Sequence, residues 1–180
     1  MRLLVLCFLF GFFQGFSQNN NIYSNQITTQ DGQVYNMAQF KGRKIIVVIL
    51  PKSSSLADSL TVLSLDSFSR QNAGQVYVIG VVPIVSSSVG DSASVLNNWY
   101  KKIFGNNLII TNSGNLQKSS THQDQVFTWL THAASNGHFD QDITGPGQVY
   151  FINESGQLYG MISSDTKYTN RILNKMIQTN

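Results

Sequence analysis

The sequence predicts an α/β protein with a central mixed sheet, helices on the faces of that sheet and an additional β-hairpin near the N-terminus. Two uninterrupted apolar runs, at 45–50 and 76–82, have the composition of strands that are buried on both faces. Each run precedes a segment whose apolar residues recur at helical spacing. Near the C-terminus, two further strand-like segments flank a turn at 153–156 and precede a last helix.

Length and composition favour one folded domain with a weakly charged surface. The chain has 180 residues, of which 12% are charged, about half the usual share. Hydrophobic residues make up 42%, which is enough for a core, so the composition excludes a disordered chain. The formal net charge is +3 and the basic residues are scattered, so we expect no nucleic-acid partner.

Residues 1–18 have the layout of a secretory signal peptide. A positively charged start and an apolar run over 3–13 are followed by small and polar residues, which predicts cleavage after Ser17 or Gln18. The run is shorter than the roughly 20 residues that span a membrane, so no stable membrane insertion is expected. We therefore expect residues 19–180 to form one exported domain, periplasmic or extracellular. A buried or anchoring N-terminal helix is the alternative.

Cys7 is the only cysteine in the sequence, and it lies inside the predicted leader. Removal of the leader leaves a chain without a thiol, so no disulfide, cysteine-based metal cluster or dithiol redox pair is expected within one chain. Cys7 lies within the apolar run rather than at its end, which argues against a lipoprotein anchor.

The first elements are expected to be a hairpin and a strand–helix–strand unit. The hairpin is expected over 22–37, because strand-like pairs flank Asp31 and Gly32, which favour a tight turn. The helix between the buried strands is predicted from apolar residues at helical spacing, which are Leu56, Leu60, Leu63 and Phe68.

The second half of the chain continues the alternation of strands and helices. The expected elements are a helix through 95–103 capped by Asp91 or Ser92, a strand at 108–110, a helix around 126–130, hairpin strands at 149–152 and 158–162, and a helix at 172–177. A strand–helix–strand unit followed by an antiparallel pair and a terminal helix is the pattern of a thioredoxin-like fold.

Four segments resemble the glutathione peroxidase branch of that fold. Residues 29–35 are similar to the family's opening hairpin, and residues 40–44 are similar to its YKGK segment before the buried strand. Residues 125–137 resemble the PLYKWL helix and the turn after it, and residues 150–158 resemble the KFLID-x-x-G hairpin. The segments occur in the family's order, so the resemblance implies a divergent member of this family.

The positions that carry the family's peroxidase chemistry are not matched. Counted without gaps from residues 40–44, the peroxidatic cysteine or selenocysteine corresponds to Ser54. Val85 lies in the segment that corresponds to the glutamine-bearing loop, and Gly145 and Pro146 lie where the family has Trp-Asn-Phe. The resemblance therefore implies that the whole catalytic tetrad is replaced.

The chemistry of serine agrees with a loss of peroxidase activity. Peroxide reduction needs a thiolate that becomes a sulfenic acid and is reduced again. A serine hydroxyl is barely ionised near neutral pH and has no comparable series of reversible oxidations. We therefore expect no peroxidase catalysis and no cofactor.

Other polar candidates are interpreted as structural. The three histidines are too far apart in the sequence for two of them to share one helical turn, so no metal site is expected; they are His122, His132 and His138. Asp140 and Asp142 are expected in a surface turn. No G-x-S-x-G elbow is present, so a hydrolase at Ser54 would need one of the histidines within hydrogen-bond reach.

These observations predict a pseudoenzyme that acts as a binding or interaction module. Its partner, a protein or a small molecule, is expected to dock around 53–56, 85–88 and 145–148. The alternatives are an enzyme with other chemistry, such as a Ser54 hydrolase, and a redox accessory in the oxidative-stress response that takes its thiols from a partner.

Overall fold

The two apolar runs of the sequence lie side by side at the centre of a five-stranded sheet. β3 (Lys44–Ile49) and β4 (Val76–Pro83) pair in parallel, with Ile45 opposite Tyr77. Every residue of β3 after the first is buried, as expected for a strand that is covered on both faces. The computed structural model describes residues 20–29, 31–52, 56–83, 92–105, 107–113, 115–166 and 169–179.

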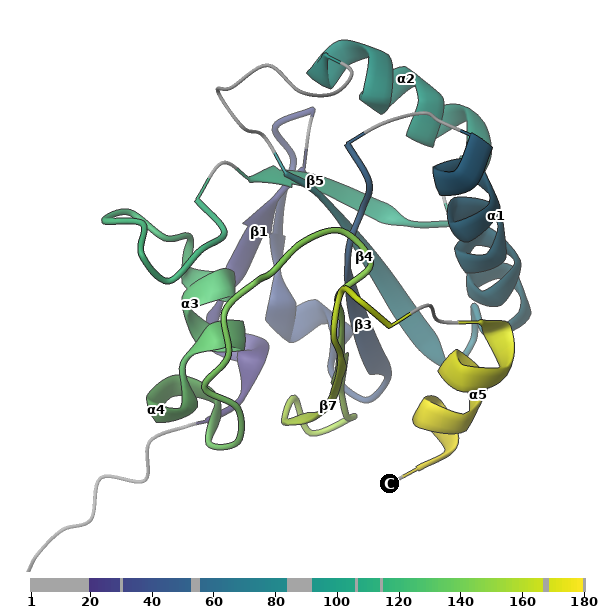
Figure 1. The fold of residues 1–180 in the computed structure, drawn as a ribbon. Coiled ribbons are helices and arrows are strands. Elements are labelled where there is room, and N and C mark those ends of the chain that lie inside the picture. Colours follow the sequence, from purple (N-terminus) through teal and green to yellow (C-terminus); the bar gives the residue numbers. More distant parts are fainter. Residues whose placement is uncertain are drawn as a thin grey trace, which may run out of the picture.

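The sheet is mixed and has the strand order β5–β4–β3–β6–β7 (Figure 1). β5 (Ile109–Ser113) runs parallel to β4. β6 (Val149–Ile152) runs antiparallel to both β3 and β7 (Leu158–Ile162). The beginning of β6 therefore lies beside the carboxyl end of β3, and this arrangement forms one end of the sheet.

The N-terminal hairpin forms as predicted. β1 (Gln26–Thr28) and β2 (Val34–Asn36) pair antiparallel in a separate two-stranded sheet. In the turn, Gly32 N donates to Thr29 O at 3.0 Å, and the φ of Gly32 is +82°, a conformation that favours glycine. Two short 3₁₀ helices, Ile22–Ser24 and Met37–Phe40, flank the hairpin and were not predicted.

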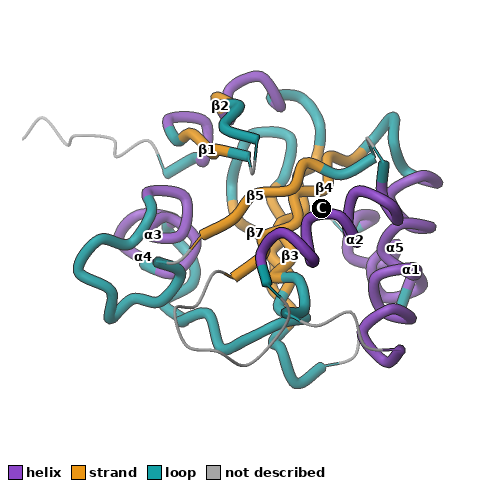
Figure 2. The backbone as a smooth tube through the Cα atoms, turned by 90° about the horizontal axis from the view of Figure 1, so that it is seen from above, coloured by secondary structure: helices purple, strands orange, loops and turns teal. Residues whose placement is uncertain are grey.

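Helices cover both faces of the central sheet (Figure 2). α1 (Leu56–Gln71), α2 (Ala93–Phe104) and α5 (Asn170–Gln178) lie on one face. α3 (Gln125–Thr131), the single turn α4 (Ala133–Asn136) and the hairpin lie on the other. The structure confirms the predicted class, a mixed sheet flanked by helices with an N-terminal hairpin.

The prediction that Leu63 lies on the buried face of α1 is wrong. Leu63 is 52% exposed, whereas Val62, Leu65 and Phe68 are buried. The sheet-facing side of a helix repeats every three to four residues, and here it passes through 62, 65 and 68, so Leu63 lies on the solvent side. Val95, in the first turn of α2, is exposed for the same reason, since Leu96 and Tyr100 form the buried side.

The N-terminal segment packs on the turn between β6 and β7. Ile22 N donates to Gly156 O at 2.9 Å, and the Tyr23 hydroxyl donates to Glu154 O at 2.7 Å. Gly156 has a φ of +81°, and a Cβ atom there would lie 2.6 Å from the Tyr23 ring. The glycine is therefore required by both its backbone conformation and the close approach of Tyr23.

Gly156→Ala is expected to lower the free energy of unfolding by about 2–4 kcal/mol, because left-handed strain adds to the clash with Tyr23. Gly32→Ala is the matched control, since its φ is +82° and no atom lies within 4 Å of the added Cβ. In the control, backbone strain alone is expected to lower the free energy of unfolding, by about 1 kcal/mol. Urea unfolding measures both losses, and equal losses would contradict the importance of the Tyr23 contact.

Tyr159 is expected to make stability depend on pH in the alkaline range. Its hydroxyl donates to Met176 O at 3.0 Å, and burial, with a smaller effect of the Glu154 charge, raises the pKa of Tyr159 from 10.0 to about 12. Between these two pH values the folded chain keeps a proton that the unfolded chain loses, so stability falls as pH rises. For this half-buried group we expect a loss of about 1–2 kcal/mol.

Urea unfolding at about pH 9 and about pH 11.5 tests this dependence. Tyr159→Phe should make the loss between the two pH values smaller than in the wild type. Some loss should remain, because burial also raises the pKa of Tyr150. An identical loss in the variant would rule out Tyr159 as a source of the dependence.

Candidate functional site

The carboxyl ends of β3 and β4 meet the loop before β6 at one end of the sheet. Gly147 N donates to Ile49 O at 2.8 Å, and Ile49 N donates to Gln148 O at 2.9 Å. Leu50 N donates to Val81 O at 2.8 Å, which holds the segment after β3 against β4. We refer to this place as the rim, defined as residues 50–52, 83 and 145–148.

The structure describes two of the four predicted site positions. Gly145 and Pro146 lie on the rim, beside the end of β3. Ser54 and Val85 lie outside the described residues. The structure therefore brings the 145–148 loop next to the segment that leads to Ser54, and the surroundings of Ser54 itself remain a prediction.

Gln148 holds the rim loop in place through its side chain, which is buried at 1% exposure. Its Oε1 accepts hydrogen bonds from Thr144 N at 2.8 Å and from the Thr144 hydroxyl at 3.1 Å. Its Nε2 donates to Asp142 O at 3.1 Å and to the Tyr150 hydroxyl at 2.7 Å. Sequence analysis included Gln148 in the rim but missed this role, because a glutamine before an apolar strand gives no signal that its amide is buried.

A second buried hydrogen bond fixes the opposite side of the rim. Tyr100, on α2, is fully buried, and its hydroxyl donates to Pro51 O at 2.6 Å. Lys52 is the only residue among the rim positions with a charged side chain. Apart from Lys52, the described part of the rim therefore offers fixed main-chain groups and uncharged side chains, and none of its residues carries a thiol.

The rings of His132 and His122 contact residues of their own segments. The Nδ1 atom of His132 lies 3.0 Å from Thr128 O, and that of His122 lies 3.0 Å from the Thr121 hydroxyl. Among the residues that the structure describes, no three side chains of the types His, Cys, Asp or Glu could hold a metal ion together.

Asp140 and Asp142 both bind Lys118. The Lys118 ammonium donates to Asp140 Oδ1 at 2.7 Å, and Lys118 N donates to Asp142 Oδ1 at 3.0 Å. The hydrogen bond from Lys118 lowers the pKa of Asp140. The two carboxylates therefore tie the segment around Lys118 to the loop that leads to the rim.

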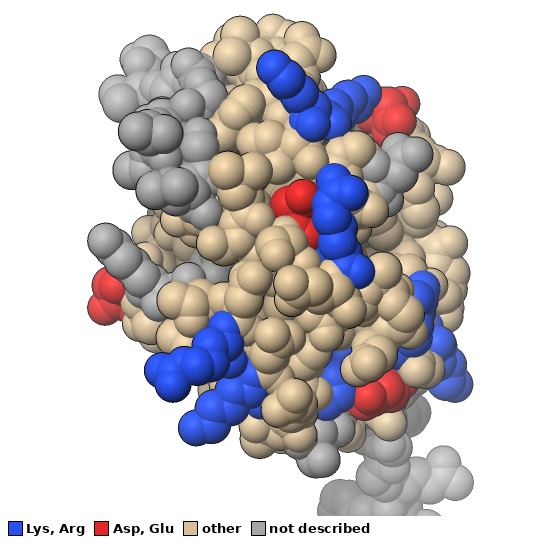
Figure 3. All heavy atoms as spheres, turned by 90° about the vertical axis from the view of Figure 1, so that its right-hand side faces the viewer, with Lys and Arg blue, Asp and Glu red and all other residues tan. Residues whose placement is uncertain are grey.

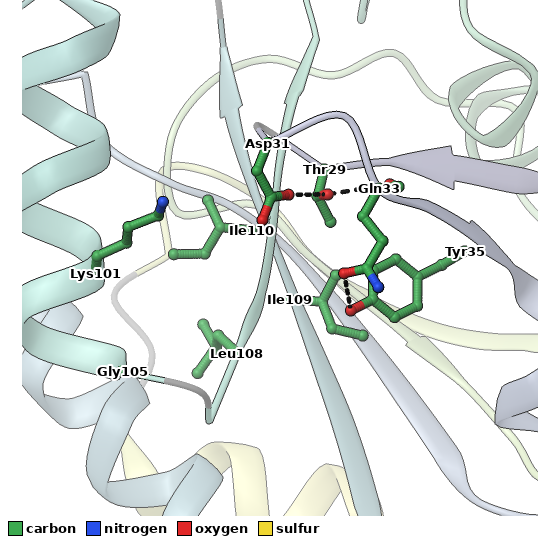
Figure 4. A pocket seen from close by; sticks show the side chains of 9 residues that line it. All are labelled: Thr29, Asp31, Gln33, Tyr35, Lys101, Gly105, Leu108, Ile109 and Ile110. Atoms are coloured by element: carbon green, nitrogen blue, oxygen red, sulfur yellow. Dashed lines mark hydrogen bonds between the residues drawn. The ribbon is translucent and has the colours of Figure 1, made fainter.

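On the face formed by α1, α2 and α5, basic side chains are scattered among uncharged ones (Figure 3). No helix within the described ranges is long and apolar enough to cross a membrane. A hollow of about 480 Å³ lies beside β5, between α2 and the hairpin (Figure 4), and another of about 440 Å³ adjoins it.

Comparison with solved structures identifies the fold. A crystal structure of Trgpx in apo form is similar, with a TM-score of 0.63 and 14% identity over 88% of this chain and 94% of that one. GPX1 of T. cruzi has a TM-score of 0.58 and 12% identity, with 88% of this chain and 94% of that one covered. Etrx1, an exposed lipoprotein thioredoxin from Streptococcus pneumoniae, has a TM-score of 0.57 and 17% identity, with coverage of 86% and 98%.

The chain is therefore a thioredoxin-fold protein whose structural neighbours are redoxins of the peroxidase and thioredoxin types. At these identities the likeness is one of fold. No protein-family model matches the sequence, and no curated protein sequence matches it.

Gln148→Leu is expected to lower the free energy of unfolding by about 2–4 kcal/mol, because it removes every hydrogen bond of a buried amide and leaves the buried Tyr150 hydroxyl without this partner. Gln157→Leu is the control, because that side chain is exposed and only its contacts with the Asn153 turn are lost. It is expected to change stability by less than about 0.5 kcal/mol. Similar losses in urea unfolding would show that the Gln148 hydrogen bonds do not stabilise the rim.

Proposed function

We propose that this chain is an exported, thioredoxin-fold pseudoenzyme of glutathione peroxidase descent that acts as a binding or interaction module. The observation that carries the proposal is the absence of any cysteine after Cys7. Redoxin chemistry proceeds through a thiolate, so a chain without one keeps the scaffold and lacks the reacting group.

The rim is the proposed docking surface. Its main chain is fixed by the hydrogen bond from the Tyr100 hydroxyl to Pro51 O and by those between the buried Gln148 amide and its neighbours. A surface that is ordered before binding loses little conformational entropy when a partner docks. Apart from Lys52 its groups are uncharged, which favours a partner that forms hydrogen bonds and apolar contacts over one attracted mainly by charge.

Export is part of the proposal. Residues 1–18 are proposed to be a signal peptide, and 19–180 the domain that is released to the periplasm or the extracellular space. The layout of charge and hydropathy over residues 1–18 supports this location. One structural neighbour, Etrx1, is itself described as an exposed lipoprotein.

Peroxide consumption by the purified protein, with a thiol reductant present, tests the loss of chemistry. The wild type is expected to be indistinguishable from buffer, because serine cannot form a sulfenic acid. Ser54→Cys is expected to gain at least about tenfold over the wild type, because a thiol at that position is predicted to lie before the N-terminus of a helix, which favours the thiolate. Ser55→Cys, one position out of register, is the matched control and should gain less.

Three outcomes would contradict the proposal in different ways. Turnover by the wild type with small thiols would show that the chain retains peroxidase chemistry. Turnover that needs a reduced dithiol protein would favour the redox accessory. Covalent labelling of Ser54 by a fluorophosphonate, lost in Ser54→Ala, would favour the hydrolase.

A further inference from the structure

The hollow beside β5 is lined by one positively and one negatively charged side chain. Lys101 projects from α2 and Asp31 from the turn of the hairpin, with Ile110 between them in the view of Figure 4. Both charged residues are exposed, so a ligand can reach them from solvent. A ligand in this hollow therefore meets an ammonium group from one element and a carboxylate from another.

The two charged groups influence each other without forming an ion pair. The hydrogen bond from the Thr29 hydroxyl, 2.5 Å from Asp31 Oδ1, is the main cause that lowers the pKa of Asp31, and the charge of Lys101 adds to this effect. Among the ion pairs of the described residues, none joins Lys101 to Asp31. The Lys101 ammonium and the second oxygen of Asp31 therefore remain available to a ligand.

Apolar side chains line the hollow between the two charges. Leu108, Ile109 and Ile110 contribute to its lining, and the two isoleucines are only partly buried. On the hairpin side, the Tyr35 hydroxyl donates to Gln33 Oε1 at 2.8 Å, which fixes the tyrosine ring beside Ile109 (Figure 4). The hollow therefore offers opposite charges together with an apolar surface.

The adjoining hollow of about 440 Å³ is aromatic and uncharged. It shares Tyr35, Leu108 and Ile109 with the hollow beside β5, so the two are continuous. Tyr35, Phe40 and Tyr77 all contribute to its lining, and none of its lining residues is charged. The ring centroids of Tyr35 and Phe40 are 6.1 Å apart, and those of Phe40 and Tyr77 are 4.6 Å apart. A series of aromatic rings therefore leads away from the two charges.

We propose that the two hollows together bind a free aromatic α-amino acid in its zwitterionic form. The carboxylate of the ligand pairs with Lys101, and its ammonium group pairs with Asp31. Its side chain extends into the adjoining hollow, against the ring of Tyr35. This binding site goes beyond partner docking at the rim, and it does not depend on whether the chain has lost peroxidase chemistry.

The pair of charges favours a zwitterion over other small ligands. An anion would be attracted by Lys101 and repelled by Asp31, and a cation would experience the reverse. A neutral compound would gain from neither charge. An α-amino acid carries its ammonium group, its carboxylate and its side chain on one carbon atom, so a small molecule can meet both charges while its ring contacts the aromatic lining.

Titration of the purified protein with phenylalanine, followed by NMR at about pH 6, where α-amino groups are protonated, tests the proposal. Exposed ion pairs contribute little, so we expect a Kd of about 1–10 mM, with amide shifts that centre on Tyr35 and 108–110. Three blocked forms keep the ring and lack one or both charges: N-acetylphenylalanine, phenylalaninamide and N-acetylphenylalaninamide. Each should bind at least about threefold more weakly than the zwitterion. Glycine, which has both charges and no ring, should bind at least about tenfold more weakly.

Neutral substitutions of the two charged residues provide the matched comparison. Asp31→Asn keeps an oxygen that can accept the Thr29 hydrogen bond, and Lys101→Met keeps an apolar side chain of similar length. Each should weaken binding of phenylalanine by about three- to tenfold. Lys101→Met should not weaken binding of phenylalaninamide, which has no carboxylate to lose a partner. Lys102→Met, an exposed neighbour on α2 that lines neither hollow, should change the affinity for phenylalanine less than about twofold.

The proposal is overturned if phenylalanine does not bind saturably up to about 50 mM, if the fully blocked form binds as well as the zwitterion, or if the two lysine variants behave alike. Shifts that centre on 145–148 would also overturn it, while supporting the rim as the docking surface. Peroxide turnover by the wild type would contradict the proposed loss of chemistry and leave this result unaffected.

Discussion

Burial of β3 between two hydrophobic cores is the constraint on which the rest of the structure depends. Ile46 and Val48 face the core beneath α1, α2 and α5, while Ile45 and Val47 face the core beneath α3 and the hairpin. Because successive side chains of a strand point to opposite faces, one short segment fixes both layers at once. A shift of β3 by one residue would exchange the two cores, so its register is strongly specified.

The position of β3 determines the geometry of the rim. Ile49, the last residue of β3, is bonded through both its N–H and its carbonyl to the loop before β6. Gln148 and Tyr100 then supply the buried polar contacts that hold the two sides of the rim. These contacts hold the rim without a reactive group, so the fold is compatible with the loss of chemistry that we propose.

The rim and the hollow beside β5 differ in what they offer to a partner. Apart from Lys52, the rim presents uncharged groups on a fixed main chain, so hydrogen bonds and apolar contacts would decide its affinity. The hollow beside β5 is lined by Lys101 and Asp31 together with apolar side chains, so charge would contribute more there than at the rim. The hairpin contacts the central sheet through the bridge between Thr111 and Thr29, the residue that directly follows β1.

The sequence by itself determined the order of elements, the central position of β3 and β4, and the absence of a thiol outside the predicted leader. These follow from local patterns: apolar runs, the Asp31–Gly32 turn pair and residue identity. The tertiary structure decided that α1 buries Val62 rather than Leu63, that the Gln148 amide is buried, and that Thr29 meets Thr111. These depend on which face of an element meets which neighbour, a contact between residues far apart in the chain that local spacing does not encode.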